Sequence, residues 1–114
     1  MTPFDVVLVP FPFADLSTTK QRPCLVITSF KPTRLNEHVI VAMMTSHVSG
    51  LGFPHDVSLV DWQKAGLPKP TLVRLAKVVT LDRKLVRRKL GRLLKTDQQA
   101  IVMKFKELFL PLLS

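Results

Sequence analysis

Apolar residues occur in short runs along this chain, and proline, glycine and polar residues separate the runs. Short runs bounded by such breakers are typical of β-strands. Strands are expected at residues 5–13, 25–29, 39–44, 57–60, 71–81 and 86–94. The first and third runs are apolar at nearly every position, which predicts strands buried on both faces. Five or six short strands predict a small, strongly curved β-barrel of the SH3-like type.

The spacing of apolar residues changes near the C-terminal end. There they recur every three or four positions, as on one face of a helix, at Ile101, Phe105, Leu108 and Leu112. Thr96 and Gln99 form the T-x-x-Q pattern of a capping box, so the helix is expected to begin at Thr96. Asp97 suits the positive end of the helix dipole, and Pro111 disfavours helix beyond it. The fold class is therefore mainly β with a C-terminal helix, in a single domain spanning residues 1–114.

Residues 71–81 form the longest expected strand. A period of two places Leu72, Arg74, Ala76 and Val78 on one face and Val73, Leu75, Lys77 and Val79 on the other. A cation among apolar neighbours at Arg74 then requires either an acidic partner or an anionic ligand.

Positive charge is concentrated in one part of the chain. The formal net charge is +9, and nine Lys or Arg but a single acid, Asp82, lie between Arg74 and Lys95. Such a segment indicates a polyanionic partner: a nucleic acid, an acidic protein segment or a membrane surface. No apolar run approaches the ~20 residues needed to span a bilayer. The single cysteine, Cys24, forbids an intramolecular disulfide and suits a reducing compartment, so the cytoplasm is the expected location.

Several chemistries lack the residues that they need. His38, His47 and His55 are not at metal-binding spacing, Cys24 has no second cysteine, and the eight carboxylates are not paired. Neither a metal nor a nucleotide cofactor is therefore expected. Cys24 lies within an apolar run and is interpreted as a buried hydrophobe rather than a catalytic thiol.

RNA carries its own nucleophile, because its 2′-hydroxyl can attack the neighbouring phosphorus in line. The enzyme must then stabilise the phosphate oxygens, orient the phosphate and move two protons. Arginine matches phosphate oxygens with its planar donors, and hydroxyl groups can orient the phosphate. Candidates near strand ends are Arg22, Thr45, Ser46 and Arg74.

The chain resembles the MazF/PemK toxin family across roughly residues 4–95. The resemblance rests on the order DVVLVPFPFADLSTTKQRPCLVIT, then VIVAMMTS, then LVRLAKVVTLDRKLVRRKLGRL. It implies an SH3-like barrel shared with CcdB-type toxins and a homodimer. The implied activity is metal-independent, sequence-selective cleavage of single-stranded RNA to 2′,3′-cyclic phosphate and 5′-hydroxyl ends. The implied antagonist is a cognate antitoxin with a flexible acidic segment.

The resemblance assigns roles to individual residues. Arg22 matches the family's arginine before proline, Thr45 with Ser46 matches its Thr-Ser pair, and Arg74 matches an arginine of the PemK branch. That branch has an aspartate two residues later as general base, where this chain has Ala76. The departure favours Arg22 and Thr45 as the working pair. Expected RNA contacts are Ser17, Thr19, Lys20, Phe53, His55, Lys77, Arg87 and Arg88.

Other interpretations remain open from the sequence. Arg22 can form a loop salt bridge, Arg74 can belong to a solvated ion pair, and the basic segment can be a solvated face. A CcdB-like toxin that binds DNA gyrase without cutting anything uses the same fold. A degenerate family member that binds RNA without cleaving it is a third interpretation, which Ala76 supports.

Overall fold

A computed structural model describes residues 1–11, 20–32, 36–46 and 52–114. Within these residues, the strands are β1 (Asp5–Phe11), β2 (Lys20–Phe30), β3 (His38–Thr45), β4 (Asp56–Ser58), β5 (Leu72–Asp82) and β6 (Arg88–Arg92). A 3-10 helix, η1 (Arg83–Leu85), joins β5 to β6, and helix α1 (Lys95–Leu113) follows. The expected succession of strands and the C-terminal helix is confirmed.

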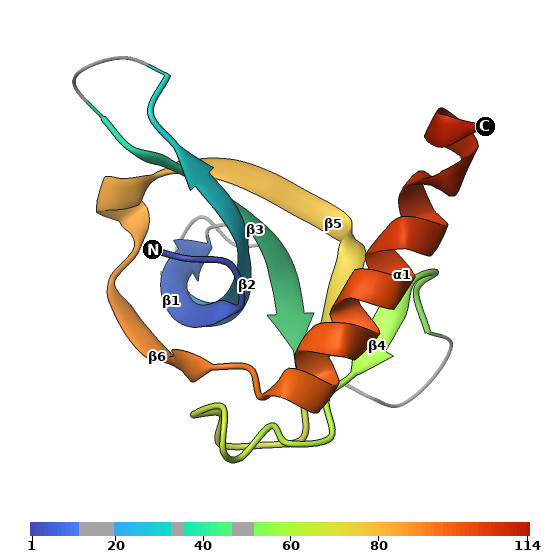
Figure 1. The fold of residues 1–114 in the computed structure, drawn as a ribbon. Coiled ribbons are helices and arrows are strands. Elements are labelled where there is room, and N and C mark those ends of the chain that lie inside the picture. Colours follow the sequence, from blue (N-terminus) through green and yellow to red (C-terminus); the bar gives the residue numbers. More distant parts are fainter. Residues whose placement is uncertain (12–19, 33–35, 47–51) are drawn as a thin grey trace.

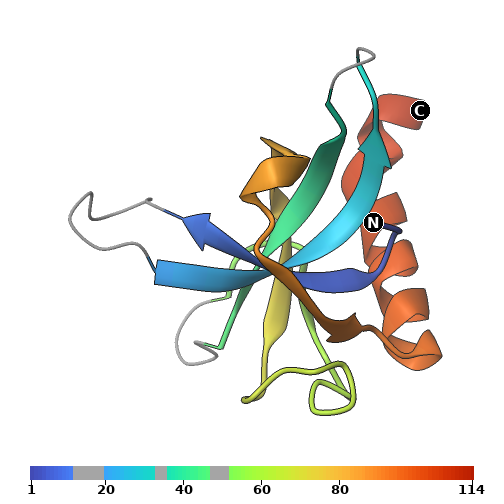
Figure 2. The ribbon, with the colours of Figure 1, turned by 90° about the vertical axis from the view of Figure 1, so that its left-hand side faces the viewer.

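The strands form one antiparallel sheet in the order β4-β5-β3-β2-β1-β6. The sheet curls strongly, so that β6 and β5 lie on either side of β1 and β2 (Figure 1). Helix α1 runs along one side of this curled sheet, next to β4 and β5 (Figures 1 and 2). The mainly β, barrel-like fold predicted from the apolar runs is therefore confirmed.

Side chains of the central strands are buried on both faces of the sheet. Val6 of β1, Leu25 of β2 and Ala42 of β3 belong to a cluster on the α1 side, which also contains Ile101. The alternating residues, such as Val7, Cys24 and Val41, belong to a second cluster inside the curl. Since both faces are filled by apolar side chains, polar groups that meet solvent come from strand ends, loops and edge strands.

Helix α1 begins and ends differently from the sequence prediction. It begins at Lys95 rather than Thr96, and the N-cap residue Leu94 makes no side-chain cap hydrogen bond. The prediction of a Thr96–Gln99 capping box is therefore wrong. The neighbouring Gln98 instead donates a hydrogen bond from Nε2 to the Leu93 carbonyl. The helix also continues through Pro111 to Leu113; the carbonyl that loses its N–H partner there belongs to the exposed end of the helix, where water can replace that partner.

Asp97 attaches the first turn of α1 to the β4–β5 connection. Its carboxylate accepts hydrogen bonds from the Val60 and Asp61 backbone N–H groups, each at 2.9 Å. Only 1% of Asp97 is exposed, so these bonds are shielded from water. The residue expected to favour the helix dipole therefore also fixes the position of the helix on the sheet.

The predicted regular alternation along residues 71–81 is wrong because β5 contains a large irregularity. Arg74 pairs with Met43 of β3, whereas Ala42, the residue before Met43 in β3, pairs with Val78. Three residues, Leu75, Ala76 and Lys77, therefore have no partner in this register. Such an irregularity turns the side chains that follow it, so Ala76 does not simply share a face with Arg74.

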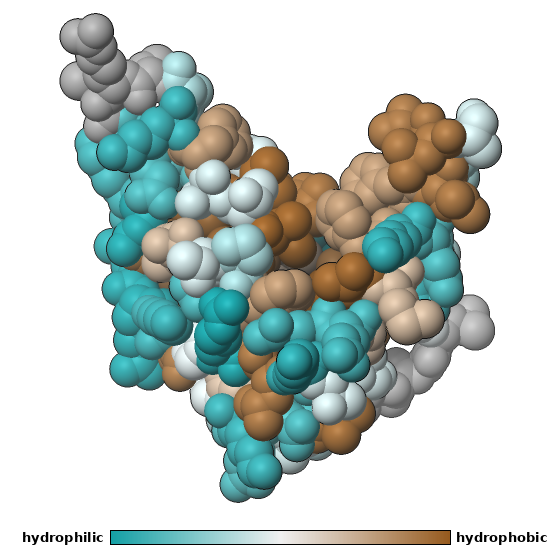
Figure 3. All heavy atoms as spheres, in the orientation of Figure 1, coloured by the Kyte–Doolittle hydropathy of each residue, from teal (hydrophilic) through white to brown (hydrophobic). Residues whose placement is uncertain are grey.

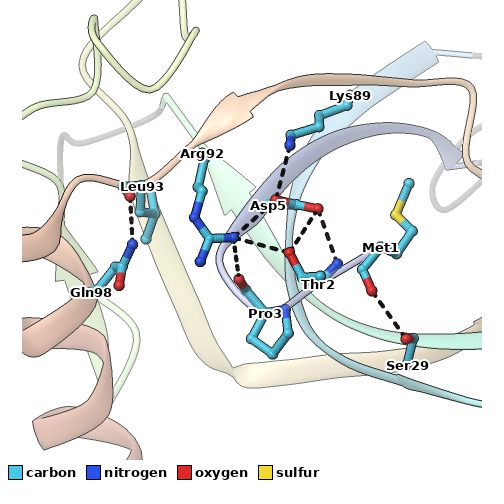
Figure 4. A network of polar contacts seen from close by, with 9 residues as sticks. All are labelled: Met1, Thr2, Pro3, Asp5, Ser29, Lys89, Arg92, Leu93 and Gln98. Carbon is cyan, nitrogen blue, oxygen red and sulfur yellow. Dashed lines mark hydrogen bonds and ion pairs between the residues drawn. The ribbon is translucent and has the colours of Figure 1, made fainter.

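A buried carboxylate joins the N-terminal residues to β6. Asp5 is 4% exposed and accepts hydrogen bonds from the Thr2 N–H at 3.0 Å and from Arg92 Nη1 at 3.2 Å. Lys89 Nζ lies 3.3 Å from the same carboxylate (Figure 4). Arg92 also donates to the Pro3 carbonyl. Burial would raise the pKa of Asp5, but the Thr2 hydrogen bond, Lys89 and Arg92 outweigh burial and lower it.

Two glycines let the loop before β5 pack directly on β6. Gly66 has φ +92°, and a Cβ added there would overlap the Leu90 carbonyl group. A Cβ added at Gly91 would overlap the Ala65 carbonyl group. The two backbones therefore approach more closely than any other residue type permits.

We expect Gly91→Ala to lower the free energy of unfolding by about 2 kcal/mol or more, because the backbone at Ala65 must move to make room. Urea unfolding followed by circular dichroism measures the change. Gly52→Ala is the matched control, because its Cβ would lie 3.8 Å from the nearest atom, Asp56 Oδ2. Equal stability of the two variants would contradict the close contact.

We expect Asp5→Asn to lower the free energy of unfolding at neutral pH by about 2 kcal/mol, because Lys89 and Arg92 lose their counter-charge. A lowered pKa means that the ionised carboxylate stabilises the fold above the unfolded-state pKa. This contribution is lost as the pH falls through the folded-state pKa.

The gap between wild type and Asp5→Asn should therefore narrow below a pH of about 4. Urea titrations at several pH values measure the gap. Glu107→Gln, which removes an exposed carboxylate of α1, should leave stability within about 0.5 kcal/mol at every pH. A gap for Asp5→Asn that widens on acidification would contradict the assignment.

Candidate functional site

A groove lies between β1, β2, the end of β3, the start of β6 and the loop that precedes β5. Its volume is about 550 Å³. Apolar side chains contribute Leu8, Met44, Leu67 and Leu90 to its lining. The polar residues that line it are Gln21, Arg22, Thr45, Ser46, Lys69, Thr71 and Arg88. The structure thus brings Arg22, Thr45 and Ser46, three of the predicted catalytic residues, to one groove.

The register of the sheet explains why Arg22 and Thr45 meet there. Cys24 of β2 pairs with Met43 of β3 in an antiparallel register. Continued for two more residues toward the groove, this register would bring Arg22 opposite Thr45, and both residues line the groove. Side chains opposite each other on antiparallel strands have Cβ atoms ~5 Å apart. Cys24 and Met43 both contribute to the core inside the curl, so Arg22 and Thr45 continue that row beyond the point where the core ends.

The groove is suited to an anion. Arg22 and Arg88 are both exposed, and neither guanidinium has an ion-pair partner among the described residues. The hydroxyls of Thr45 and Ser46 lie on the same lining. Guanidinium groups bind phosphate oxygens through two parallel N–H donors, and hydroxyl groups add single hydrogen bonds. A phosphate group therefore fits this set of side chains.

Arg74 does not line this groove. It lies in a second cluster, where Asp56 of β4 pairs with it across the strands. Arg74 Nε is 3.7 Å from Asp56 Oδ2, and the guanidinium carbon of Arg74 is 5.7 Å from the centre of the Phe53 ring. Lys77 Nζ is 4.9 Å from the same ring. We refer to Phe53, Asp56, Arg74 and Lys77 as the Phe53 cluster.

A tight turn holds the Phe53 cluster in place. Asp56 Oδ2 accepts a hydrogen bond from the Phe53 N–H at 2.9 Å, and the Asp56 N–H donates to the Phe53 carbonyl at 3.2 Å. His55, between them, has φ +66° and is half-buried. Phe53, His55 and Lys77 are predicted RNA contacts, whereas Asp56 is not among the residues predicted from the sequence. The sequence shows Asp56 only as an acid that follows Phe53-Pro54-His55, and this position does not reveal its partner on another strand.

Part of the basic segment has a structural role. Lys89 and Arg92 pair with the buried carboxylate of Asp5, so their charge is partly neutralised. Arg87 and Arg88 are exposed. Arg88 lines the groove, and Arg87 borders a neighbouring hollow of about 400 Å³ together with Arg83. Of the predicted RNA-binding cations of this segment, Arg88 is therefore the one that meets Arg22 and Thr45.

Other predicted residues lie outside the described part of the chain. Ser17 and Thr19 precede β2 in an undescribed segment, and His47 follows β3 in another. Lys20 begins β2, but its side chain is not described. The expected contacts of these residues with RNA stay predictions.

Thiol chemistry is not available at Cys24. The residue is fully buried in the core inside the curl. Burial raises its pKa to about 12, so the thiolate that nucleophilic chemistry needs is scarce at neutral pH. The interpretation of Cys24 as a buried hydrophobe is confirmed. Among the described residues, no group of three or more His, Cys, Asp or Glu could hold a metal ion, and no helix is long and apolar enough to cross a bilayer.

Solved structures share this fold. The chain is similar to the Mycobacterium tuberculosis toxin MazF-mt6, with a TM-score of 0.68 and 23% identity over 92% of this chain and 95% of that one. It is also similar to a chain of the MazE-MazF structure from Deinococcus radiodurans, with a TM-score of 0.69 and 18% identity over 96% of this chain and 94% of that one.

A third similar structure is an endoribonuclease in complex with its cognate antitoxin from a mycobacterial species. Its TM-score is 0.69 and its identity 14%, over 94% of this chain and 92% of that chain. At these identities the likenesses establish the fold alone. A comparison with curated protein sequences found no match.

The family comparison covers nearly the whole sequence. The model of the PemK-like, MazF-like toxins of type II toxin–antitoxin systems matches residues 2–109. The match includes every element that lines the groove and the Phe53 cluster, so it extends beyond the motifs around Arg22 and Thr45. The chain therefore belongs to the family of PemK-like, MazF-like toxins of type II toxin–antitoxin systems.

Proposed function

We propose that this toxin is a metal-independent, sequence-selective endoribonuclease that cleaves single-stranded RNA and thereby inhibits translation. The observation that carries the proposal is the groove in which Arg22, Thr45, Ser46 and Arg88 come together. Structurally similar proteins bear the name endoribonuclease, which supports the same reaction class.

The reaction is an in-line transphosphorylation within the RNA. The 2′-oxygen loses its proton and bonds to phosphorus, while the bond from phosphorus to the 5′-oxygen breaks and that oxygen gains a proton. The products are a 2′,3′-cyclic phosphate and a 5′-hydroxyl. Atoms and charge balance without any co-reactant, because one proton is in effect transferred from the 2′-oxygen to the 5′-oxygen.

Arg22 stabilises the negative charge that develops on the phosphate oxygens. Its guanidinium is exposed near the start of β2, and its planar N–H donors match the oxygens of a phosphate group. Thr45 and Ser46 orient the scissile phosphate by hydrogen bonding to its oxygens. Preorganised donors of this kind lower the barrier because they bind the transition state more strongly than the ground state.

Arg88 holds the RNA backbone at the opposite wall of the groove. It comes from β6, whereas Arg22 comes from β2, and β1 lies between them in the sheet. The two cations therefore contact the polyanion from different strands. Arg87 and Lys77 extend the positive surface outside the groove. Binding through such contacts weakens steeply as the salt concentration rises.

We also propose two protein partners. An antitoxin with a flexible acidic segment would neutralise the exposed cations, and similar structures are of toxins with their antitoxins. A second copy of the chain would cover the projecting end of α1, where Leu110, Leu112 and Leu113 are more than half exposed. Figure 3 shows this end of α1 as a hydrophobic surface. Because the substrate is translated RNA, the proposed place of action is the cytoplasm.

We expect the protein to cleave single-stranded RNA in the presence of EDTA, and Arg22→Ala to lower the cleavage rate about 100-fold or more. Denaturing gel electrophoresis with analysis of the new ends measures both. Arg83→Ala is the matched control, because Arg83 is an exposed arginine of η1 that does not line the groove. It should cleave within about 2-fold of wild type.

A 2′-deoxy nucleotide at the cut site should abolish cleavage, since it removes the nucleophile. Cleavage of that substrate, or an Arg22→Ala variant as active as wild type, would contradict the mechanism. RNA binding that weakens with salt but yields no products would favour a binding protein instead.

A further inference from the structure

The Phe53 cluster has a property that the sheet register alone does not predict. In a regular strand, Arg74 and Lys77 would lie on opposite faces of β5. The three unpartnered residues between the two registers of β5 remove this constraint. Both cations consequently lie over one aromatic ring, Lys77 at 4.9 Å and Arg74 at 5.7 Å. Irregularities that re-aim side chains in this way are frequent next to functional sites.

Asp56 holds Arg74 by one side of its guanidinium. The contact joins Nε to Oδ2 at 3.7 Å, which is an ion pair rather than a hydrogen bond. Asp56 is itself held by the tight turn, because its Oδ2 also accepts a hydrogen bond from the Phe53 N–H. The terminal amino groups of Arg74 have no hydrogen-bond or ion-pair partner among the described residues. Arg74 therefore has one oriented side and one side available to an anion.

The Phe53 cluster lies next to the groove, because Arg74 of β5 is a diagonal neighbour of Thr45 of β3. Thr45 pairs with Leu72, and Met43, two residues earlier in β3, pairs with Arg74. Diagonal neighbours on adjacent strands are ~7–8 Å apart, which is the order of the spacing between successive nucleotides in an extended single strand. An RNA held at Thr45 can therefore place a neighbouring nucleotide on the Phe53 cluster.

We propose that Asp56 is the residue that positions Arg74 within the Phe53 cluster, where the expected RNA contacts would receive a nucleotide flanking the scissile phosphate. This inference rests on the proposed function. The ring of Phe53, 39% exposed, stacks with the base. Arg74 and Lys77 contact the adjoining phosphate. Arg74 thus binds substrate in this chain rather than acting on the bond that breaks.

Ala76 agrees with this division of roles. In the PemK branch, the position that corresponds to Ala76 carries a carboxylate, on the same strand as Arg74. The structure instead places a carboxylate beside Arg74 from β4, at Asp56. Oδ2 of that carboxylate is already engaged by the Phe53 N–H and by Arg74, and Oδ1 is shielded from solvent. Asp56 is therefore arranged to orient a cation and not to receive a proton from a substrate.

The test uses Asp56→Asn, which keeps an oxygen for the Phe53 N–H but removes the charge that orients Arg74. Affinity is measured by fluorescence anisotropy with an oligonucleotide carrying a 2′-deoxy nucleotide at the cut site. Turnover is measured on the matching all-ribose RNA. We expect Asp56→Asn to weaken binding and raise KM about 10-fold while kcat stays within about 2-fold. Lys77→Ala, at an exposed position, should show the same pattern.

The sign of the effect separates positioning from simple charge. Removing an acid from a protein that binds RNA ordinarily strengthens binding, and the control Glu107→Gln, on α1, should leave affinity unchanged or slightly increased. In an Arg74→Ala background, Asp56→Asn should cause no further loss, because Asp56 acts through Arg74. Thermal unfolding of each variant verifies that the protein remains folded.

Tighter binding by Asp56→Asn, or additive losses in the double variant, would overturn the positioning role. A fall in kcat with unchanged KM for Arg74→Ala would overturn the subsite and place Arg74 in the chemistry. These outcomes differ from a failure of the proposed function, in which wild type does not cleave RNA at all. The anisotropy measurements still decide on the subsite in that case, since they require no cleavage.

Discussion

Burial of both sheet faces is the constraint on which the rest of this structure depends. Side chains of β1, β2 and β3 pack into one core beneath α1 and into another inside the curl. A polar residue in the middle of these strands would lose its water without gaining a partner. Polar groups that can meet a ligand therefore lie beyond the core, and the groove there collects Arg22 and Thr45. The core and the groove are consequences of a single arrangement.

Two departures from regular structure lie close to the groove. Gly66 and Gly91 let the loop before β5 lie directly against β6, which forms one wall of the groove. The irregularity in β5 lets Lys77 share an aromatic ring with Arg74. A chain of minimal strain would have neither feature, and local departures of this kind tend to concentrate where a protein binds its ligand.

The sequence was sufficient for the strands, the helix and the residues at strand ends, because apolar runs and the Arg22 and Thr45 motifs are local signals. It was insufficient wherever a contact joins distant segments. Asp56 orients Arg74 from a three-residue strand, too short to show periodicity. Asp97 was interpreted as a dipole effect, yet its main bonds reach a loop 36 and 37 residues away. Long-range pairing of single polar groups leaves no periodic pattern to detect.

The same limitation applies to the positive charge. A count of residues assigns nearly all of the net charge of +9 to the segment from Arg74 to Lys95, but the fold divides these cations by role. Two of them, on β6, compensate the buried Asp5 carboxylate, and Arg74 is oriented by Asp56. What a polyanion meets is therefore a small set of positioned side chains rather than a uniform basic face. Arg22 in the groove and Arg74 beside it differ in one physical respect. The first has no carboxylate partner among the described residues and can respond to charge that develops during a reaction, whereas the second is already oriented before any ligand arrives.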